Sequence, residues 1–225
     1  MTPALHHVGA RRSPVVVVDG FMGNWQAAVE AAAALAPFPP AGNYYPGVRR
    51  MIAREDGAAH AYVDAMLEAA APFIGGAFDV TGFDLLEASF SLVTADPATL
   101  EPQQRAPHFD SLDPDYLAVL HFLSDTPDTG TAFFRQRATG IELLDDYNVA
   151  RFVETSRAEG AEPGYIRGSN PSFEQIAAFD GIADRLLIYR GASLHSGIIP
   201  AGMPLSADPR LGRLTANIFV QGRRR

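Results

Sequence analysis

Two short motifs carry side chains that could bind one metal ion together. The first is Pro107-His108-Phe109-Asp110, and the second is Leu194-His195-Ser196-Gly197. Side chains two residues apart in an extended segment point the same way, so His108 and Asp110 can reach one ion while Phe109 points away. Two imidazoles and one carboxylate on one face of an ion leave three coordination positions open, which is typical of non-haem Fe(II) sites.

The absence of cysteine narrows the chemistry of this site. The 225 residues contain no cysteine, so disulfides, thiolate metal sites and thiol nucleophiles are excluded. Any metal must be held by His, Asp or Glu, and such ligands suit open iron, zinc or manganese centres. The same three side chains could hold Zn(II) with a bound water for hydrolysis, although no clear Glu or His stands near the motifs as a general base.

The segment that opens the last predicted strand, Leu214–Val220, is equipped to hold a carboxylate. Period-two alternation places Arg213, Thr215 and Asn217 on one face and apolar side chains on the other. Arginine can donate two parallel hydrogen bonds to a carboxylate, and a threonine hydroxyl can add a third. The alternative interpretation is a half-exposed edge strand with a surface arginine.

The elements that must position these residues fall into two groups. In the N-terminal part, the residue pattern predicts a buried strand over Val15–Val18 and helices over Trp25–Ala36 and His60–Ala71. After Pro72, short β-prone runs broken by Gly, Pro and Asp are typical of an antiparallel sandwich or barrel. These runs are Leu85–Thr94, Tyr116–Leu123, Thr131–Arg135, Arg185–Tyr189 and Leu214–Val220.

The sequence therefore predicts one domain over residues 1–225, of class α+β and mainly β. Residues 1–75 would form a strand and a helical layer, and residues 76–225 a β-rich core with the helices covering one face of its sheets. Within the core, Pro171–Phe179 predicts a short helix, and residues 147–170 predict an irregular insertion. His6 and His7 are expected to lie in a frayed terminus.

Composition limits the classes of partner. The chain is 47% hydrophobic and 20% charged, which is ordinary for a globular protein. Its formal charge of −8 repels phosphate backbones, so we expect no nucleic-acid partner. No apolar run approaches the roughly 20 residues that span a bilayer, and Met1–Ala10 lacks a signal-peptide pattern. We expect no membrane partner and a cytoplasmic location, while oligomeric state has no signal in the sequence.

The order of these motifs resembles the Fe(II)/2-oxoglutarate-dependent dioxygenase superfamily, most closely its prolyl-hydroxylase-like branch. The runs PHFDS, GTAFFRQRATG and RLLIYRGASLHSG resemble a bacterial subfamily of uncharacterised proteins, and VVVVDGFM resembles the first strand of that branch. The resemblance covers most of the chain. It implies a double-stranded β-helix, a jelly-roll core with helices packed on one side.

The resemblance also assigns roles to individual residues. It implies that His108, Asp110 and His195 bind Fe(II), and that the distal carboxylate of 2-oxoglutarate pairs with Arg213 and Thr215. A departure from the family is the interval of 18 residues from His195 to Arg213, which is longer than usual and suggests a loop insertion.

Other residues are candidates for neighbouring roles. Arg210 is the second candidate for the carboxylate anchor, and Tyr116 is a candidate contact to the oxo-acid. Arg135 and Arg137 share a strand face and could hold an acidic substrate. The aromatic-basic loop 44–49, with Tyr45, could line a substrate entrance.

The implied reaction is a hydroxylation, or an oxidation that follows it, of a small-molecule or peptide substrate by dioxygen. All three protein ligands are present, which favours hydroxylation over halogenation. Two alternatives stay open: a zinc hydrolase on the same triad, and a non-catalytic metal-binding module of the same fold. His121 lies on the opposite strand face from Tyr116 and is expected to be structural.

Overall fold

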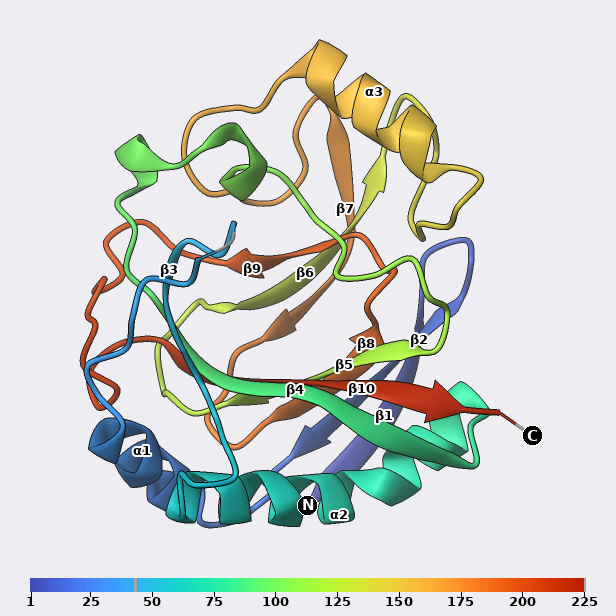
Figure 1. The fold of residues 1–225 in the computed structure, drawn as a ribbon. Helices are drawn as coiled ribbons and strands as arrows, with labels where there is room; N and C mark the ends of the chain where they lie inside the picture. Colours follow the sequence, from blue (N-terminus) through green and yellow to red (C-terminus); the bar gives the residue numbers. More distant parts are fainter. Residues whose placement is uncertain (43, 225) are drawn as a thin grey trace.

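The computed structural model describes residues 1–42 and 44–224, which form two antiparallel sheets and three α-helices (Figure 1). The strands are β1 (Thr2–Val8), β2 (Ser13–Asp19), β3 (Gly47–Met51), β4 (Gly82–Val93), β5 (Tyr116–Phe122), β6 (Gly130–Gln136), β7 (Phe173–Asp180), β8 (Leu186–Arg190), β9 (His195–Ile198) and β10 (Leu214–Arg223). The helices are α1 (Trp25–Ala34), α2 (Ala58–Phe78) and α3 (Val149–Glu159).

The large sheet has the strand order β1-β2-β8-β5-β10-β4-β3, and the small sheet has the order β7-β6-β9. Buried residues of α2 cluster with one face of the large sheet, and α1 joins the same layer near β4 and β10 (Figure 1). The other face of β2, β5 and β8 packs against Phe133 of the small sheet. The large sheet thus has an outer face under the helices and an inner face toward the small sheet.

The valine run of β2 shows why a strand in this position has no polar face. Val16 and Val18 belong to the layer under α2, whereas Val15 and Val17 pack on the inner side with residues of β5 and β8. A strand covered on both faces contains a continuous apolar run rather than an alternating one. The predicted buried strand is therefore present, and so are the five strands predicted in the core, which are β4, β5, β6, β8 and β10.

Two segments of the core differ from the prediction. Pro171–Phe179 was predicted to be a helix, but Phe173–Asp180 is strand β7, which pairs with β6. Its pairing partner outweighs the helical preference of its alanines, because strand preference depends on the tertiary neighbours. The predicted irregular insertion contains α3, which buries Phe152 against Phe109 and the outer side of the small sheet.

Two N-terminal segments also differ from their prediction, which placed His6 and His7 in a frayed terminus and ended the second helix at Ala71. His6 and His7 lie in β1, which pairs with β2 along its whole length. Helix α2 continues past Pro72 to Phe78. Its buried side chains recur every three or four residues and carry on beyond the proline through Ile74 and Phe78, and this packing offsets the missing backbone N–H.

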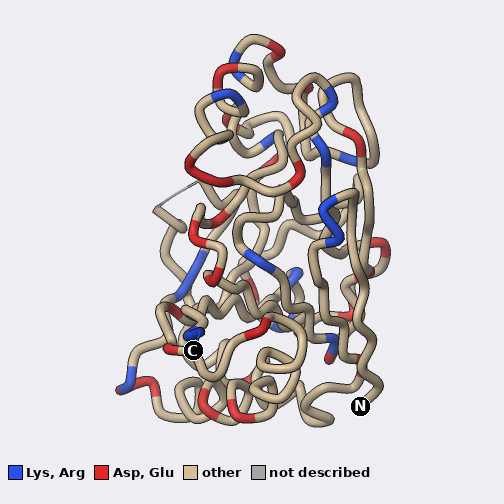
Figure 2. Tube along the Cα trace, turned by 90° about the vertical axis from the view of Figure 1, so that its right-hand side faces the viewer, with Lys and Arg blue, Asp and Glu red and all other residues tan. Residues whose placement is uncertain are grey.

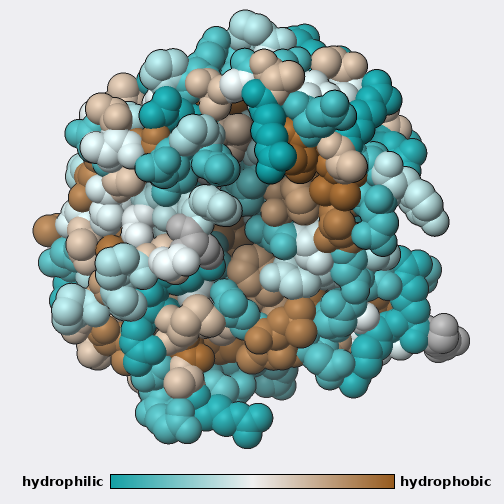
Figure 3. Space-filling view, turned by 45° about the horizontal axis from the view of Figure 1, so that its top comes forward, coloured by the Kyte–Doolittle hydropathy of each residue, from teal (hydrophilic) through white to brown (hydrophobic). Residues whose placement is uncertain are grey.

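The surface carries mixed charge and dispersed apolar groups. Acidic and basic residues are interspersed along the chain (Figure 2), and on the face in Figure 3 hydrophobic side chains reach the surface in separate groups among hydrophilic ones. Among the described residues, no helix has the length and apolar character needed to cross a membrane.

A buried hydrogen-bond network joins α2 to the large sheet. The Tyr62 hydroxyl lies 2.8 Å from His121 Nδ1, and His121 Nε2 lies 3.0 Å from Asp184 Oδ1. The Asp184 carboxylate also accepts hydrogen bonds from the backbone N–H groups of Met22 and Gly23. His121 thus has a structural position under α2, in agreement with the strand alternation.

Replacing His121 by leucine is expected to lower the free energy of unfolding at pH 7.5 by about 2 kcal/mol, because Tyr62 and Asp184 lose a buried partner. Burial lowers the pKa of His121, although Asp184 opposes this. Below about pH 6.5, His121 binds a proton in the unfolded chain but stays neutral in the folded chain. The free energy of unfolding of the wild type therefore falls as the pH drops below this value. The variant should lose this part of the pH dependence.

Chemical denaturation of the metal-free protein at pH 7.5 and 5.5 measures both effects. The matched control is His60→Gln on α2, whose side chain is 29% exposed and which should change the free energy of unfolding at pH 7.5 little. Equal stability of His121→Leu and wild type at pH 7.5 would contradict the structural role of the network.

Candidate functional site

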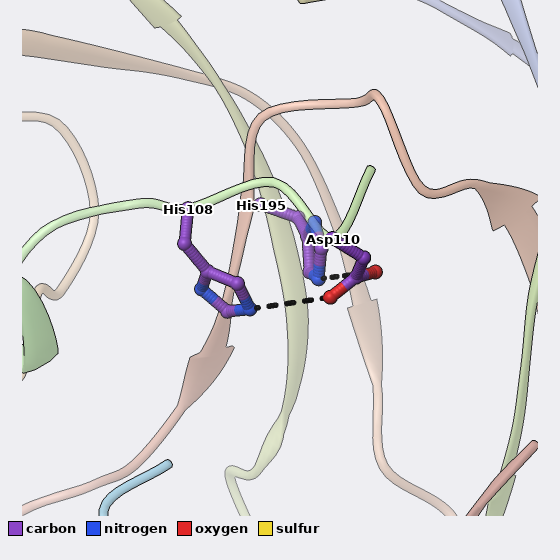
Figure 4. A group of neighbouring side chains, drawn as sticks. All are labelled: His108, Asp110 and His195. Atoms are coloured by element: carbon purple, nitrogen blue, oxygen red, sulfur yellow. Dashed lines mark ion pairs between the residues drawn. The ribbon is translucent and has the colours of Figure 1, made fainter. Parts of the chain in front are cut away.

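Backbone pairing brings the three candidate metal ligands together. His108 and His195 form an antiparallel bridge, in which each backbone N–H donates to the carbonyl of the other at 2.8 Å. Two residues later, the Asp110 N–H donates to the Gly191 carbonyl at 2.7 Å. The H-x-D segment is therefore fixed against Gly191, the residue after the end of β8, and against His195 at the start of β9, and its two side chains point to the same side (Figure 4).

The ligand atoms of His108, Asp110 and His195 all lie within 4.8 Å of one another (Figure 4). Asp110 Oδ1 is 3.8 Å from His108 Nε2, and Oδ2 is 3.6 Å from His195 Nε2. His195 Nδ1 donates a hydrogen bond to the Ser193 carbonyl at 2.8 Å. This bond fixes the tautomer of the neutral ring and leaves the Nε2 lone pair free to coordinate a cation.

Burial sets the protonation of the triad. The His195 side chain is only 6% exposed, and burial lowers its pKa to about 4, so the ring is neutral at neutral pH as a metal ligand must be. Burial raises the pKa of Asp110 to about 6, and its Oδ2 has no hydrogen-bond partner among the described residues. A buried carboxylate oxygen beside two imidazoles fits a bound cation. The His108 ring is 55% exposed, so the site opens to solvent on that side.

Gly191 permits the close approach of Asp110 to the sheet. A Cβ atom at this position would lie 2.6 Å from Tyr116 Cδ1 and 3.2 Å from Asp110 Cβ. We therefore expect Gly191→Ala to displace Asp110 and to weaken Fe(II) binding about 10- to 100-fold, as loss of a supporting contact does at other metal sites. An anaerobic metal titration measures this.

Gly76→Ala in α2 is the matched control, because a Cβ atom there meets nothing within 4 Å. It should bind metal like the wild type. An unchanged metal affinity in Gly191→Ala would show that Asp110 does not need the close approach.

A second group of buried polar side chains surrounds Arg213. This arginine is 5% exposed, and its Nη2 donates to the Gly130 carbonyl at 2.9 Å, while Nε has no hydrogen-bond partner among the described residues. Burial raises the pKa of the nearby Tyr45 phenol, whereas the Arg213 charge and hydrogen bonds with Thr215 and Ser91 lower it. A buried guanidinium with an unused donor, next to hydroxyl groups, suits an anion.

The structure separates the two candidate anchor arginines. Arg210 lies at the surface and forms a bidentate pair with Glu30, with distances of 3.0 and 2.6 Å. Arg213 lies between the sheets, with its guanidinium over the Phe122 ring. The long interval after His195 is a loop whose residues Ile199 and Met203 pack as a small apolar cluster beside the Arg213 group.

The remaining candidates are in different surroundings. Tyr116 is half-buried on the inner face, with its ring against Phe219 and beside Gly191, close to the triad. Arg135 pairs with Glu142 and Glu174, and Arg137 donates to the Asn170 carbonyl. The structure brings Tyr45 and Tyr116 to the site but gives both arginines partners on and beside the small sheet. These two arginines are thus engaged within the protein.

Some residues of the site were missed by the sequence analysis. Tyr189 is buried, and its ring lies edge-on to His195 with 4.8 Å between ring centroids. Strand alternation in β8 carried a signal for it, because Leu187 and Tyr189 share the inner face. The contact of His195 with Ser193 uses a backbone carbonyl and therefore left no trace in the residue types.

The sequence model of one family, described as "Family of unknown function (DUF6445)", matches residues 1–220. No curated protein matches the sequence at a significant level. Several solved structures are similar in fold.

HygX from Streptomyces hygroscopicus, with nickel and 2-oxoglutarate bound, has a TM-score of 0.56 and 14% identity, covering 93% of this chain and 83% of that chain. SnoN, a non-haem α-ketoglutarate-dependent epimerase from nogalamycin biosynthesis, has a TM-score of 0.55 and 14% identity, covering 94% and 79%. Viral collagen prolyl hydroxylase from Paramecium bursaria Chlorella virus-1, in a 2-oxoglutarate complex, has a TM-score of 0.50 and 9% identity, covering 92% and 95%. The chain thus has the fold of these proteins, which confirms the resemblance at the level of the fold.

Proposed function

We propose that this chain, which belongs to the family of unknown function DUF6445, is an Fe(II)- and 2-oxoglutarate-dependent oxygenase that hydroxylates a small-molecule or peptide substrate. One observation carries the proposal: two buried polar atoms, Asp110 Oδ2 and Arg213 Nε, lack a hydrogen-bond partner among the described residues. The first belongs to a triad that fits a cation, and the second to a pocket that fits an anion. A metal chelated by a dicarboxylate would satisfy both atoms.

The three residues of the triad would act as the metal ligands. His108, Asp110 and His195 would hold Fe(II), with the His195 ring kept in its coordinating tautomer by the Ser193 carbonyl. When bound, the metal and 2-oxoglutarate supply the oxidation: one oxygen atom of dioxygen enters a substrate C–H bond, and the other enters succinate as CO2 leaves. The solvent-exposed side of His108 would face the incoming substrate.

The pocket residues would orient the cosubstrate. Arg213 Nε and the Thr215 hydroxyl would bind its distal carboxylate, with Tyr116 as a further contact near the triad. Thr215 is 1% exposed, accepts a hydrogen bond from Asn217 Nδ2 at 3.1 Å and contacts the Tyr45 phenol. Its hydroxyl would turn from Tyr45 to donate its proton to the carboxylate. Phe133 and Tyr189 beside His195 would keep water from the ligands.

The fold suits this assignment. We propose that the two sheets form a double-stranded β-helix within a single domain of residues 1–225. Residues 1–75 would contribute the helical layer and residues 147–170 an insertion that carries α3. Similar solved structures that bind 2-oxoglutarate support this reading. A zinc hydrolase on the same triad would give the buried Arg213 guanidinium no anion to bind.

Anaerobic addition of Fe(II) to metal-free protein, followed by titration with 2-oxoglutarate, tests the proposal. Chelation of Fe(II) by the oxo-acid gives a weak charge-transfer band in the visible spectrum, which should saturate. His108→Ala should abolish the band, and Arg213→Ala should weaken it. Folded protein that binds metal but gives no band would exclude the oxygenase.

A further inference from the structure

The inner face of the large sheet is apolar on one side and polar on the other. On β2, β5 and β8 the inner side chains are mostly apolar and lie under the small sheet. On β10, β4 and β3 the same face carries a polar strip, which we define as Arg49, Glu87, Ser89, Ser91, Thr215 and Asn217. Strand register places Arg49 opposite Ser91 and Ser91 opposite Thr215, so the strip continues from the pocket of Arg213 to the edge of the sheet.

Arg49 is held in place on this strip. Its side chain is 14% exposed, its Nε donates to Ser91 Oγ at 3.2 Å, and its guanidinium lies 5.0 Å from the centre of the Tyr45 ring. Its Nη1 lies 3.5 Å from Glu87 Oε1. One edge of the guanidinium is therefore fixed to the sheet, and the other edge faces Glu87.

Glu87 is a charged side chain at the open end of the strip. Its 3.5 Å contact with Arg49 is long for a charge-assisted hydrogen bond, for which about 2.8 Å is usual. Strand β3 pairs with β4 only as far as Met51 opposite Ser89, so Glu87 lies just past the end of β3. The carboxylate is 37% exposed and stands where solvent reaches the inner face.

A single row of residues links Glu87 to the triad. In strand register Glu87 lies opposite Phe219, Phe219 opposite Ala118, and Ala118 opposite Tyr189. The Tyr189 ring contacts His195.

We infer that Arg49 and Glu87 form the substrate subsite, and that the substrate is a small zwitterion with one carboxylate and one ammonium group, as in a free amino acid. The inference rests on the proposed function. Arg49 would bind the carboxylate and Glu87 the ammonium group, which leaves the substrate side chain directed along the row toward the triad. Without substrate, Arg49 and Glu87 neutralise each other in a weak ion pair. With substrate bound, this pair is replaced by two stronger ones, Arg49 with the carboxylate and Glu87 with the ammonium group. The interior of a peptide carries neither charge, so this subsite favours a free small molecule.

The test measures succinate formation with each of the common L-amino acids as probe, in the iron-loaded protein. At least one free amino acid should stimulate turnover, and its N-acetyl and carboxamide derivatives should be at least tenfold weaker. Glu87→Gln should remove the discrimination against the N-acetyl form. Arg49→Met should remove the discrimination against the carboxamide.

The matched control is Arg50→Met, because Arg50 is the next residue and pairs with Asp56 instead. It should keep the wild-type preference. Arg49→Lys keeps the positive charge and should retain part of the discrimination against the carboxamide. It keeps the test valid if Arg49→Met does not fold. No stimulation by any free amino acid, or equal stimulation by the blocked derivatives, would overturn the inference while the 2-oxoglutarate band persists. Loss of that band in Arg49→Met would instead assign Arg49 to the oxo-acid pocket, and a missing wild-type band would refute the proposed function itself.

Discussion

Asp110→Asn is expected to reduce the affinity for Fe(II) on the order of 100-fold or more, and to raise the stability of the metal-free protein by about 1 kcal/mol. The substitution removes the only carboxylate of the triad, so the remaining ligands are two neutral imidazoles. In the metal-free protein the same carboxylate is 15% exposed, and its buried Oδ2 lacks a hydrogen-bond partner among the described residues. A residue kept for metal binding at a cost in stability should show these opposite signs.

Anaerobic Fe(II) titration and denaturant unfolding of metal-free protein measure the two effects on one preparation. Asp64→Asn is the control, because this carboxylate is 67% exposed on α2 and should change neither quantity by much. Wild-type Fe(II) affinity in Asp110→Asn would remove Asp110 from the ligand set. A large loss of stability would instead indicate that Asp110 has a structural role.

The residues of the candidate site could be proposed from the sequence because they follow short-range patterns. His108 and Asp110 are two apart in an extended segment, and Arg213 and Thr215 are two apart at the start of a strand. Each pair needs only strand alternation to share a face. Their meeting in space was implied by the family resemblance, because the bridge between His108 and His195 joins segments whose pairing no local pattern reveals.

The parts of the fold that escaped prediction depend on tertiary contacts. Strand β7 has alanines that favour a helix, and β6 decides its conformation through seven paired positions. The end of α2 could not be found from Pro72, because the burial of Ile74 and Phe78 outweighs a local signal. Arg49 was predicted to lie in an aromatic-basic loop, whereas Gly47–Met51 forms strand β3 and Arg49 pairs with Ser91 on β4. This pairing depends on β4 and could not be predicted from the loop residues alone.

The long loop before Arg213 lies against the candidate pocket. Its residues Ile199 and Met203 pack beside Val93 and near Tyr45 and Tyr165. The loop therefore contributes an apolar wall next to the Arg213 group. In a water-poor pocket, an arginine discriminates more strongly between anionic and neutral ligands than it would at the surface.

Arg213→Met is consequently expected to weaken 2-oxoglutarate binding about 100-fold, since removing one partner of a buried charged pair costs roughly 2 to 5 kcal/mol. Binding of 2-oxopentanoate, which has a methyl group in place of the distal carboxylate, should change little. The wild type should thus distinguish strongly between the two acids and the variant hardly at all. The visible band of the Fe(II) complex, titrated with each acid, measures both affinities.

Arg210→Met provides the control, because Arg210 is exposed and pairs with Glu30 at the surface. It should keep the wild-type preference for 2-oxoglutarate. If Arg210→Met lost that preference and Arg213→Met kept it, the carboxylate anchor would be the surface arginine, and the buried Nε of Arg213 would need another partner. A loss of affinity for both acids in Arg213→Met would mean that the substitution disturbs the triad, because 2-oxopentanoate reaches the metal through its oxo-acid end alone.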